Sequence, residues 1–443
     1  MELICWLNEN VIWGIPMLLL FTLTGVLFTI RLGGFKVLSG IKEIFKKSTK
    51  NPDELSPFAA LTATLGTTLG TGNIIAIGTA IAFGGAGSIF WMWISAILGM
   101  MTCYAENYLG HKYRIKTAKG YEGVPFRYIS KAFGGKKLGT ATAKLFAFLC
   151  IGASLGMGNM AQINSASTML DHSAGVPLWI TGAVCVVMVV FFIRKGLERL
   201  ADITVWLIPL MSVLYIIGCT IVIISGGDKL PSVFYRIISE AFSFEAVAGG
   251  SVGSVMLNAM TWGVKRGVFS NEAGLGTSVI INAGSSCETP HQQGIWAMLQ
   301  VFIDTIVLCT MTALAILVSG ADKVSADGIN MANIAFSGVL GTAGSMFLSV
   351  AVVIFAVSTV SGWYIYGKTC VSYLLSKKWN KCYFYIFILL CFVGAVSKAR
   401  LVWEISDLLN GLMAIPNLIA LLILRKEIRK QNHHSSVCSE KSE

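Results

Sequence analysis

The stretch Leu65-Gly66-Thr67-Thr68-Leu69-Gly70-Thr71-Gly72-Asn73-Ile74 interrupts an apolar segment, 57–83, that is otherwise long enough to cross a lipid bilayer. Glycines and polar residues recur where a membrane helix would be apolar, and this pattern predicts a broken helix. Because the bilayer core holds no water for free N–H and C=O groups, unwound backbone occurs there only where it lines a cavity or contacts a ligand. The stretch therefore predicts a binding site within the membrane.

The composition is that of an integral membrane protein. The chain has 443 residues, of which 55% are hydrophobic and 13% are charged, and its mean hydropathy is +0.71. The net charge of +11 comes from basic residues in short loops between apolar runs. A positive-inside membrane topology explains this distribution better than nucleic-acid binding does.

Apolar runs of membrane-spanning length predict eleven transmembrane helices. They cover residues 11–30, 57–83, 87–109, 140–170, 176–193, 201–225, 250–271, 293–319, 343–375, 382–397 and 402–424. Alternate connecting segments hold 27 and 5 Lys and Arg residues. This bias predicts an N-terminus outside the cell and a C-terminus in the cytoplasm.

The ten spans after the first divide into two groups of five, and each group opens on an interrupted span. The second interruption is the polar, glycine-containing run 262–276. Since five is odd, the two groups enter the membrane from opposite sides. We therefore predict an all-α polytopic membrane protein with one extra N-terminal helix and a 5+5 inverted repeat with two discontinuous helices, as in secondary transporters.

The predicted organisation has five parts. They are the extra helix with a basic cytoplasmic loop (1–56), the first repeat (57–225), an external loop (226–249), the second repeat (250–424) and a disordered cytoplasmic tail (425–443). Within the external segments, 227–248 and 329–339 are expected to form short helices that cap the cavity. We expect a multi-pass protein of the cell membrane.

Five motifs give the chain a family resemblance. They are Gly70-Thr71-Gly72-Asn73-Ile74, Phe90-Trp91-Met92-Trp93 with Tyr104-Ala105-Glu106, the run 158–165, Gly267-Val268-Phe269-Ser270-Asn271-Glu272-Ala273-Gly274-Leu275-Gly276, and Asp304-Thr305-Ile306. From about residue 11 to 424 the sequence resembles the alanine/glycine:cation symporter family. The resemblance implies the leucine-transporter-like fold of ten core helices. The chain departs from the family pattern at Val124-Pro125-Phe126-Arg127, at Ile281-Asn282 and at Lys368.

The first break predicts a carboxylate site. The N-terminus of a half-helix carries free N–H groups and a partial positive charge, which suit the carboxylate of an amino acid near Thr71, Gly72 and Asn73. The alternative is that these glycines serve close helix packing. By the family resemblance, Gln162 would help to bind the same carboxylate, although a helix–helix hydrogen bond is its alternative role.

The second break predicts the remaining substrate contacts. Carbonyl groups near Phe269 and Ser270 would accept hydrogen bonds from the substrate ammonium, and the Phe269 ring would close over the side chain. Glu272 is adjacent. Its alternatives are direct ligand contact, a packing or gate role, and a charge partnership with Lys265 or Arg266.

The related fold implies a sodium site at the first break. Alignment to that fold places the Gly66 and Leu69 carbonyls as ligands, with Ser358 and Thr359 as a hydroxyl pair. Their alternative is hydrogen bonding within their own helix. Trp363, one turn further on, is expected to form a wall of the cavity.

Two sequence patterns of enzymes occur here in unsuitable surroundings. Residues 362–369 match the sequence pattern of a P-loop, but their side chains are bulky and they lie in a predicted apolar helix. Residues 152–156 match a nucleophile elbow, but no predicted span supplies a histidine base. We expect no enzymatic activity, no organic cofactor and no obligate protein partner.

The sequence thus favours a sodium-coupled symporter of small neutral amino acids, alanine and glycine above all, that works by alternating access. Serine and glutamine are possible wider substrates. One alternative is coupling to protons, with Asp304 or Glu272 as the carrier, since ionisable residues in a membrane are functional candidates. Another is a sensor or channel that binds an amino acid without transporting it.

Overall fold

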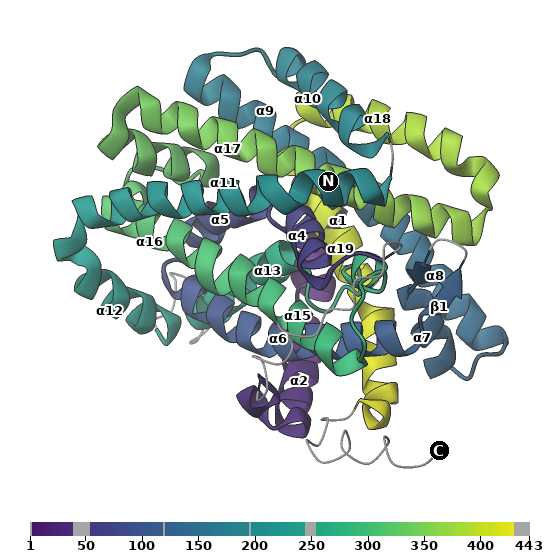
Figure 1. Ribbon diagram of the computed structural model, residues 1–443. Coiled ribbons are helices and arrows are strands. Elements are labelled where there is room, and N and C mark those ends of the chain that lie inside the picture. Colours follow the sequence, from purple (N-terminus) through teal and green to yellow (C-terminus); the bar gives the residue numbers. More distant parts are fainter. Residues whose placement is uncertain (1, 39–53, 118–119, 195, 244–253, 429–443) are drawn as a thin grey trace.

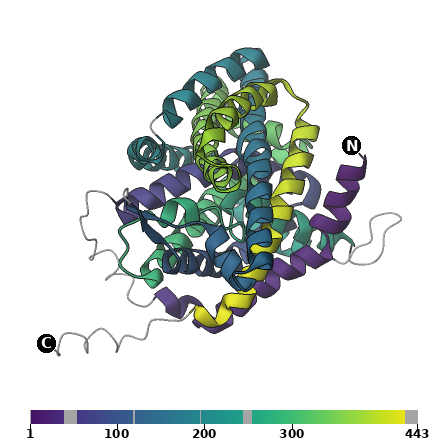
Figure 2. The ribbon, with the colours of Figure 1, turned by 90° about the vertical axis from the view of Figure 1, so that its right-hand side faces the viewer.

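The computed structural model describes residues 2–38, 54–117, 120–194, 196–243 and 254–428. The described chain is helical except for loops and one antiparallel hairpin of β1 (Ile115–Thr117) and β2 (Gly120–Glu122). Among its helices, α9, α11, α17 and α18 run alongside one another, while α2 and α19 run in a direction across theirs (Figure 1). Figure 2 shows the first of these two sets nearly end-on.

The helices follow the predicted apolar runs closely. In the first half they are α1 (Glu2–Leu7), α2 (Ile15–Leu32), α4 (Pro57–Thr68), α5 (Ile75–Gly84), α6 (Gly87–Lys112), α7 (Pro125–Ala132), α8 (Lys137–Leu155), α9 (Ala161–Ala174), α10 (Leu178–Ile193), α11 (Leu197–Ser225) and α12 (Leu230–Ala241). In the second half they are α13 (Ser254–Asn271), α14 (Val279–Asn282), α15 (Pro290–Val301), α16 (Thr310–Ser319), α17 (Gly328–Leu374), α18 (Asn380–Val396) and α19 (Ala399–Ile423).

Eight helical segments of the described chain are long and apolar enough to cross a membrane. The other three predicted spans correspond to α4 with α5, to α10 and to α13. The first is divided by its break, α10 has only 16 residues, and α13 contains Lys265 and Arg266. The fold is thus that of a multi-pass helical membrane protein, and the count of eleven spans stays a prediction.

The first break lies where the sequence predicts it. Helix α4 begins after Ser56, whose hydroxyl accepts a hydrogen bond from Ala59 N (3.1 Å), and it ends at Thr68. Residues Thr71–Asn73 form one 3₁₀ turn before α5 begins at Ile75. An added Cβ at Gly70 would lie 2.5 Å from Gln162 Oε1. A side chain at this position would therefore require Gln162 and Thr359 to move.

The second break is shorter than predicted. The run 262–271 is helical to Asn271, so the prediction of a break across its whole length is wrong. Gly263 and Gly267 lie within the helix and face α6, and an added Cβ at Gly263 would lie 2.3 Å from Ser88 O. The break starts at Glu272 (φ 58°) and includes Gly274 and Gly276, whose positive φ angles favour glycine.

Lys265 and Arg266 require a second correction. Counted as loop residues, they contributed to the predicted charge bias between the two sides of the membrane. The structure buries both side chains within α13. They therefore carry no information about which loops face the cytoplasm, and the orientation of the chain rests on the other basic residues.

The two short helices predicted outside the core both form. One is α12, and the other is the first part of α17, which a kink at Gly341 (φ 61°) separates from the long part. Their predicted external position stays a prediction. In the predicted tail, residues 424–427 form a 3₁₀ turn, and 429–443 lie outside the described residues.

Candidate functional site

Gln162 closes the first break. Its Oε1 accepts hydrogen bonds from Thr71 N and from Thr71 Oγ1, both at 2.9 Å, while its Nε2 donates to Met157 O at 3.2 Å. The π turn Gly156–Met160, between α8 and α9, precedes Gln162 by one turn. Such wide turns frequently mark functional positions. Of the donors that the sequence assigns to a ligand carboxylate, the two of Thr71 are thus held by an amide oxygen.

Asp304 joins the first break to the last turn of α13. One of its carboxylate oxygens accepts a hydrogen bond from Asn73 Nδ2 (2.8 Å), and the other accepts one from Ser270 Oγ (2.8 Å) and one from Thr305 Oγ1 (2.7 Å). Asp304 is completely buried and lies on a second π turn, Phe302–Cys309. Three neutral donors offset the cost of burying this carboxylate without a charge partner.

Phe269 and Ser270 lie directly against the first break. An added Cβ at Gly72 would lie 3.3 Å from Ser270 Cα and 3.4 Å from Phe269 Cδ1. The Phe269 ring is buried and packs on Trp403, with 4.9 Å between the ring centroids. The predicted substrate-binding residues of both segments therefore lie in one place: Thr71, Gly72, Asn73, Gln162, Phe269 and Ser270.

The residues predicted to bind sodium also meet. Thr359 Oγ1 donates to Gly66 O at 3.5 Å, and an added Cβ at Gly66 would lie 2.8 Å from Ser358 Oγ. Ser358 Oγ is buried and has no hydrogen-bond partner among the described residues. Leu69 adjoins Gly70, where an added Cβ would lie 2.7 Å from Thr359 Oγ1. An unsatisfied hydroxyl beside carbonyl groups suits a hard cation, which prefers oxygen ligands.

Glu272 contacts Trp363 and Thr277. Its Oε1 accepts from Trp363 Nε1 (2.8 Å) and its Oε2 from Thr277 Oγ1 (2.5 Å). The alternative in which Glu272 pairs with Lys265 or Arg266 is wrong. Trp363 is completely buried, and its ring fills the space where a Cβ at Gly158 would stand.

Asp407 is the acidic partner of the two buried cations of α13. Lys265 Nζ lies 2.7 Å from Asp407 Oδ2, and Arg266 makes a bidentate pair with Asp407 at 3.0 and 3.1 Å. The Arg266 guanidinium also lies over the rings of Trp403 and Phe269. The sequence marks Asp407 as an acidic residue in an apolar span but does not indicate its partners.

Glu106 accepts a hydrogen bond from the second break, a role that the sequence does not indicate. Its Oε1 accepts from Gly276 N (2.9 Å) and Asn417 Nδ2 (2.5 Å), and Asn417 Nδ2 also donates to Gly274 O (2.9 Å). An acidic residue inside apolar α6 is the only signal, because such residues are costly in a membrane. It shows that a partner is needed but not which one.

Neither enzyme-like pattern forms its characteristic loop. Residues 362–369 lie inside α17, and 152–155 lie in the last turn of α8. Ser154 Oγ donates to Ile151 O and contacts Tyr383 Oη at 2.9 Å. Within the described residues, no group of three or more His, Cys, Asp and Glu side chains is placed to hold a metal ion. The arrangement provides neutral donors, carbonyls and hydroxyls at two helix breaks.

Comparisons with known proteins agree with this arrangement. The sequence model of the sodium:alanine symporter family matches residues 1–441. A protein of Methanococcus maripaludis named Sodium/alanine symporter AgcS is 38% identical over 427 residues, which are 94% of this chain and 93% of that protein. A protein of Haemophilus influenzae named Uncharacterized transporter is also 38% identical over 427 residues, 95% of this chain and 93% of its own.

The fold also has a counterpart among solved structures. The crystal structure of MhsT in complex with L-phenylalanine superposes with a TM-score of 0.55 at 13% sequence identity. The match covers 84% of this chain and 89% of that one. At this identity the likeness establishes the fold, which is the leucine-transporter-like fold.

Proposed function

Because this chain belongs to the sodium:alanine symporter family, we propose that it carries small neutral amino acids, alanine and glycine, into the cell together with sodium. Transport proceeds by alternating access, in which two inverted five-helix repeats move around a site between the two helix breaks. The N-terminus lies outside the cell membrane and the C-terminus in the cytoplasm. The observation that carries the proposal is the convergence of the first break and the last turn of α13 on one buried polar place.

The substrate carboxylate binds at the first break. Thr71 N and Thr71 Oγ1 point to one acceptor, Gln162 Oε1. A carboxylate is a stronger acceptor than an amide oxygen, because charge-assisted hydrogen bonds are shorter and stronger. In the substrate complex the carboxylate takes over the donors of Thr71, Gly72 and Asn73, and Gln162 turns so that its amide NH₂ donates to the same carboxylate.

The substrate ammonium binds at the other wall of the site. Helix α13 ends at Asn271, and the last carbonyls of a helix have no partner within it. The Phe269 and Ser270 carbonyls accept from the ammonium, and the partial negative charge of the helix end favours it. In this proposal the Phe269 ring closes over the substrate side chain and Trp363 forms a wall of the site, so that small side chains such as those of alanine and glycine are accepted.

Sodium binds between the Gly66 and Leu69 carbonyls and the hydroxyls of Ser358 and Thr359. The unpartnered Ser358 Oγ supports this position. One cation that moves inward across 100 mV supplies about 2.3 kcal/mol, which corresponds to roughly 50-fold accumulation. One sodium ion per substrate therefore suffices for useful uptake.

Uptake of labelled alanine into proteoliposomes tests the proposal. An inward sodium gradient is compared with an equimolar potassium gradient at one fixed pH on both sides. We expect sodium-dependent accumulation. Equal uptake in both gradients would indicate that protons and not sodium are the coupling ion, with Asp304 as the candidate carrier. Binding without any uptake or exchange would indicate a sensor.

A further inference from the structure

A basic cavity lies away from the proposed transport site, where α6 ends and α7 and α17 meet. Its volume is about 660 Å³, and its lining includes four cationic and three aromatic side chains: Lys112, Arg114, Arg127, Lys131, Tyr113, Phe126 and Tyr373. Phe126 and Tyr373 stack with 4.1 Å between their ring centroids and form one wall. No motif and no part of the proposed transport mechanism uses this cavity.

Two of the four cations are already engaged. Lys112 Nζ lies 2.6 Å from Glu427 Oε2, which also accepts from Tyr113 Oη at 2.7 Å. Arg114 donates to Ser285 O at 2.8 Å and to Cys287 O at 3.1 Å. These contacts fix the back of the cavity. They also use the acidic side chain that lies closest to it.

The other two cations are the ones available to an anion, and the Glu427 carboxylate that binds Lys112 also attracts Lys131. Arg127 and Lys131 are exposed and, within the described part of the chain, make no hydrogen bond or ion pair. They stand four residues apart on α7 and therefore on one face of that helix. Like charges at this spacing repel each other and destabilise a helix. An anion between them would remove that repulsion.

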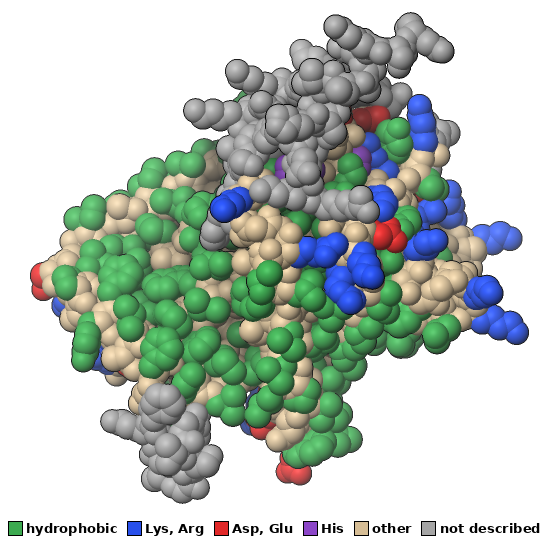
Figure 3. Space-filling model, turned by 90° about the horizontal axis from the view of Figure 1, so that it is seen from below, with side chains coloured by type: hydrophobic (Ala, Val, Ile, Leu, Met, Phe, Trp, Pro, Cys, Tyr) green, Lys and Arg blue, Asp and Glu red, His purple; other side chains and the backbone are tan. Residues whose placement is uncertain are grey.

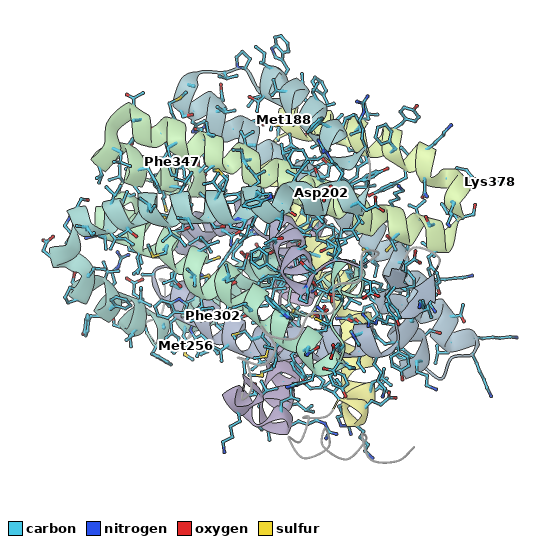
Figure 4. The ribbon with its side chains drawn as sticks, in the orientation of Figure 1. Met188, Asp202, Met256, Phe302, Phe347 and Lys378 are labelled. Carbon is cyan, nitrogen blue, oxygen red and sulfur yellow. The ribbon has the colours of Figure 1, made fainter. Side chains whose placement is uncertain are left out.

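The surroundings of the cavity select a lipid as the source of the anion. Helix α8, against which α7 packs, exposes Leu138 and Phe148, at 65% and 66% of their accessible surface. Figure 3 shows Lys and Arg gathered at one end of a broad hydrophobic face, the end that carries α7 and α8 in Figure 1. Lys378 lies at the same end, at the turn between α17 and α18 (Figure 4). Phosphate headgroups occupy such a boundary between apolar and basic surface.

We propose that this cavity binds the phosphate headgroup of an anionic phospholipid, with Arg127 and Lys131 as its ligands. Phe126 and Tyr373 form the wall beside the glycerol backbone, since aromatic side chains favour the headgroup level of a membrane. Arg127 belongs to the segment in which this chain departs from the pattern of the family it resembles. The proposed site does not depend on the proposed transport function.

Native mass spectrometry of the full-length protein in detergent tests the site. Phosphatidylglycerol is titrated against phosphatidylcholine for the wild type, for Arg127→Gln with Lys131→Gln, and for Lys136→Gln with Lys137→Gln. The last pair removes the same charge from exposed positions at the start of α8 that do not line the cavity. We expect the wild type and this control to prefer phosphatidylglycerol, and the Arg127 and Lys131 variant to bind it about 30-fold more weakly.

Three outcomes would overturn the proposal. The first is equal retention of phosphatidylglycerol by both double variants. The second is its displacement by an equal concentration of inorganic phosphate at constant ionic strength, which would identify free phosphate as the ligand. The third needs no variant: a preference for phosphatidylglycerol that does not weaken in high salt would exclude the exposed cations as its origin.

Discussion

Gln162 is the residue on which the proposed carboxylate site depends. It holds both donors of Thr71 and is itself fixed through Met157 O. In a ligand complex the same side chain becomes a donor to the carboxylate. Its amide can serve both states because it carries an acceptor and two donors.

Gln162→Ala is therefore expected to raise the half-saturation concentration for alanine roughly ten- to hundredfold, since a hydrogen bond to a charged group is lost. Concentration-dependent uptake in proteoliposomes measures this. The matched control is Gln300→Ala, which removes a buried amide of α15 that has no hydrogen-bond partner among the described residues. Unchanged half-saturation in Gln162→Ala would remove the proposed carboxylate site.

Ser358 and Thr359 allow a separate prediction for the cation. Replacing both with alanine is expected to shift sodium activation of uptake to about tenfold higher concentration or more, because two oxygen ligands are lost. Ser361→Ala is the control, since Ser361 is buried on the same helix but donates to Val357 O. A sodium curve equal to that of the wild type would place the cation elsewhere.

At the scale of the structural element, the conformation of the first break depends on the absence of a side chain at Gly70. An added Cβ at Gly70 would lie 2.5 Å from Gln162 Oε1 and 2.7 Å from Thr359 Oγ1. Residues of the proposed carboxylate site and of the proposed sodium site therefore both lie against this glycine. The φ of Gly70 is −116°, which other residues adopt, so space and not backbone conformation demands glycine here.

We expect Gly70→Ala to abolish sodium-dependent uptake while the protein still folds, because overpacking costs about 1–3 kcal/mol. The exposed Gly338 of α17, which has no atom within 4 Å of its added Cβ, supplies the control Gly338→Ala. Size-exclusion chromatography checks folding alongside the uptake assay. Wild-type transport by Gly70→Ala would show that the break tolerates movement away from Gln162 and Thr359.

At the scale of the whole molecule, Asp407 connects α19 to α13. Two buried cations depend on this one carboxylate. Removing one partner of a buried ion pair leaves charge without compensation, which is far more costly than the net worth of the pair. This cluster therefore links side chains of the two helices beside Phe269.

Asp407→Asn is expected to lower the free energy of unfolding by about 3–5 kcal/mol, seen as a clear loss of thermal stability in detergent. The control is Asp202→Asn on α11, because Asp202 is exposed and forms no ion pair with any described residue (Figure 4). Equal melting temperatures for the two variants would mean that Lys265 and Arg266 reach water or another partner once Asp407 is neutral.

The sequence by itself determined the membrane class, the positions of the helices and the location of the first break. Hydrophobic run length and glycine spacing are local properties, and they follow from the cost of burying polar backbone in lipid. The sequence also named most residues that converge on the two breaks, partly through its family resemblance.

Only the tertiary structure decided which polar groups pair. It joined Asn73 and Ser270 at Asp304, assigned Lys265 and Arg266 to Asp407 instead of Glu272, and let α13 run to Asn271. These partners lie far apart in the sequence. A pattern along the chain shows that a buried charge needs a partner, but only the folded arrangement of helices selects it.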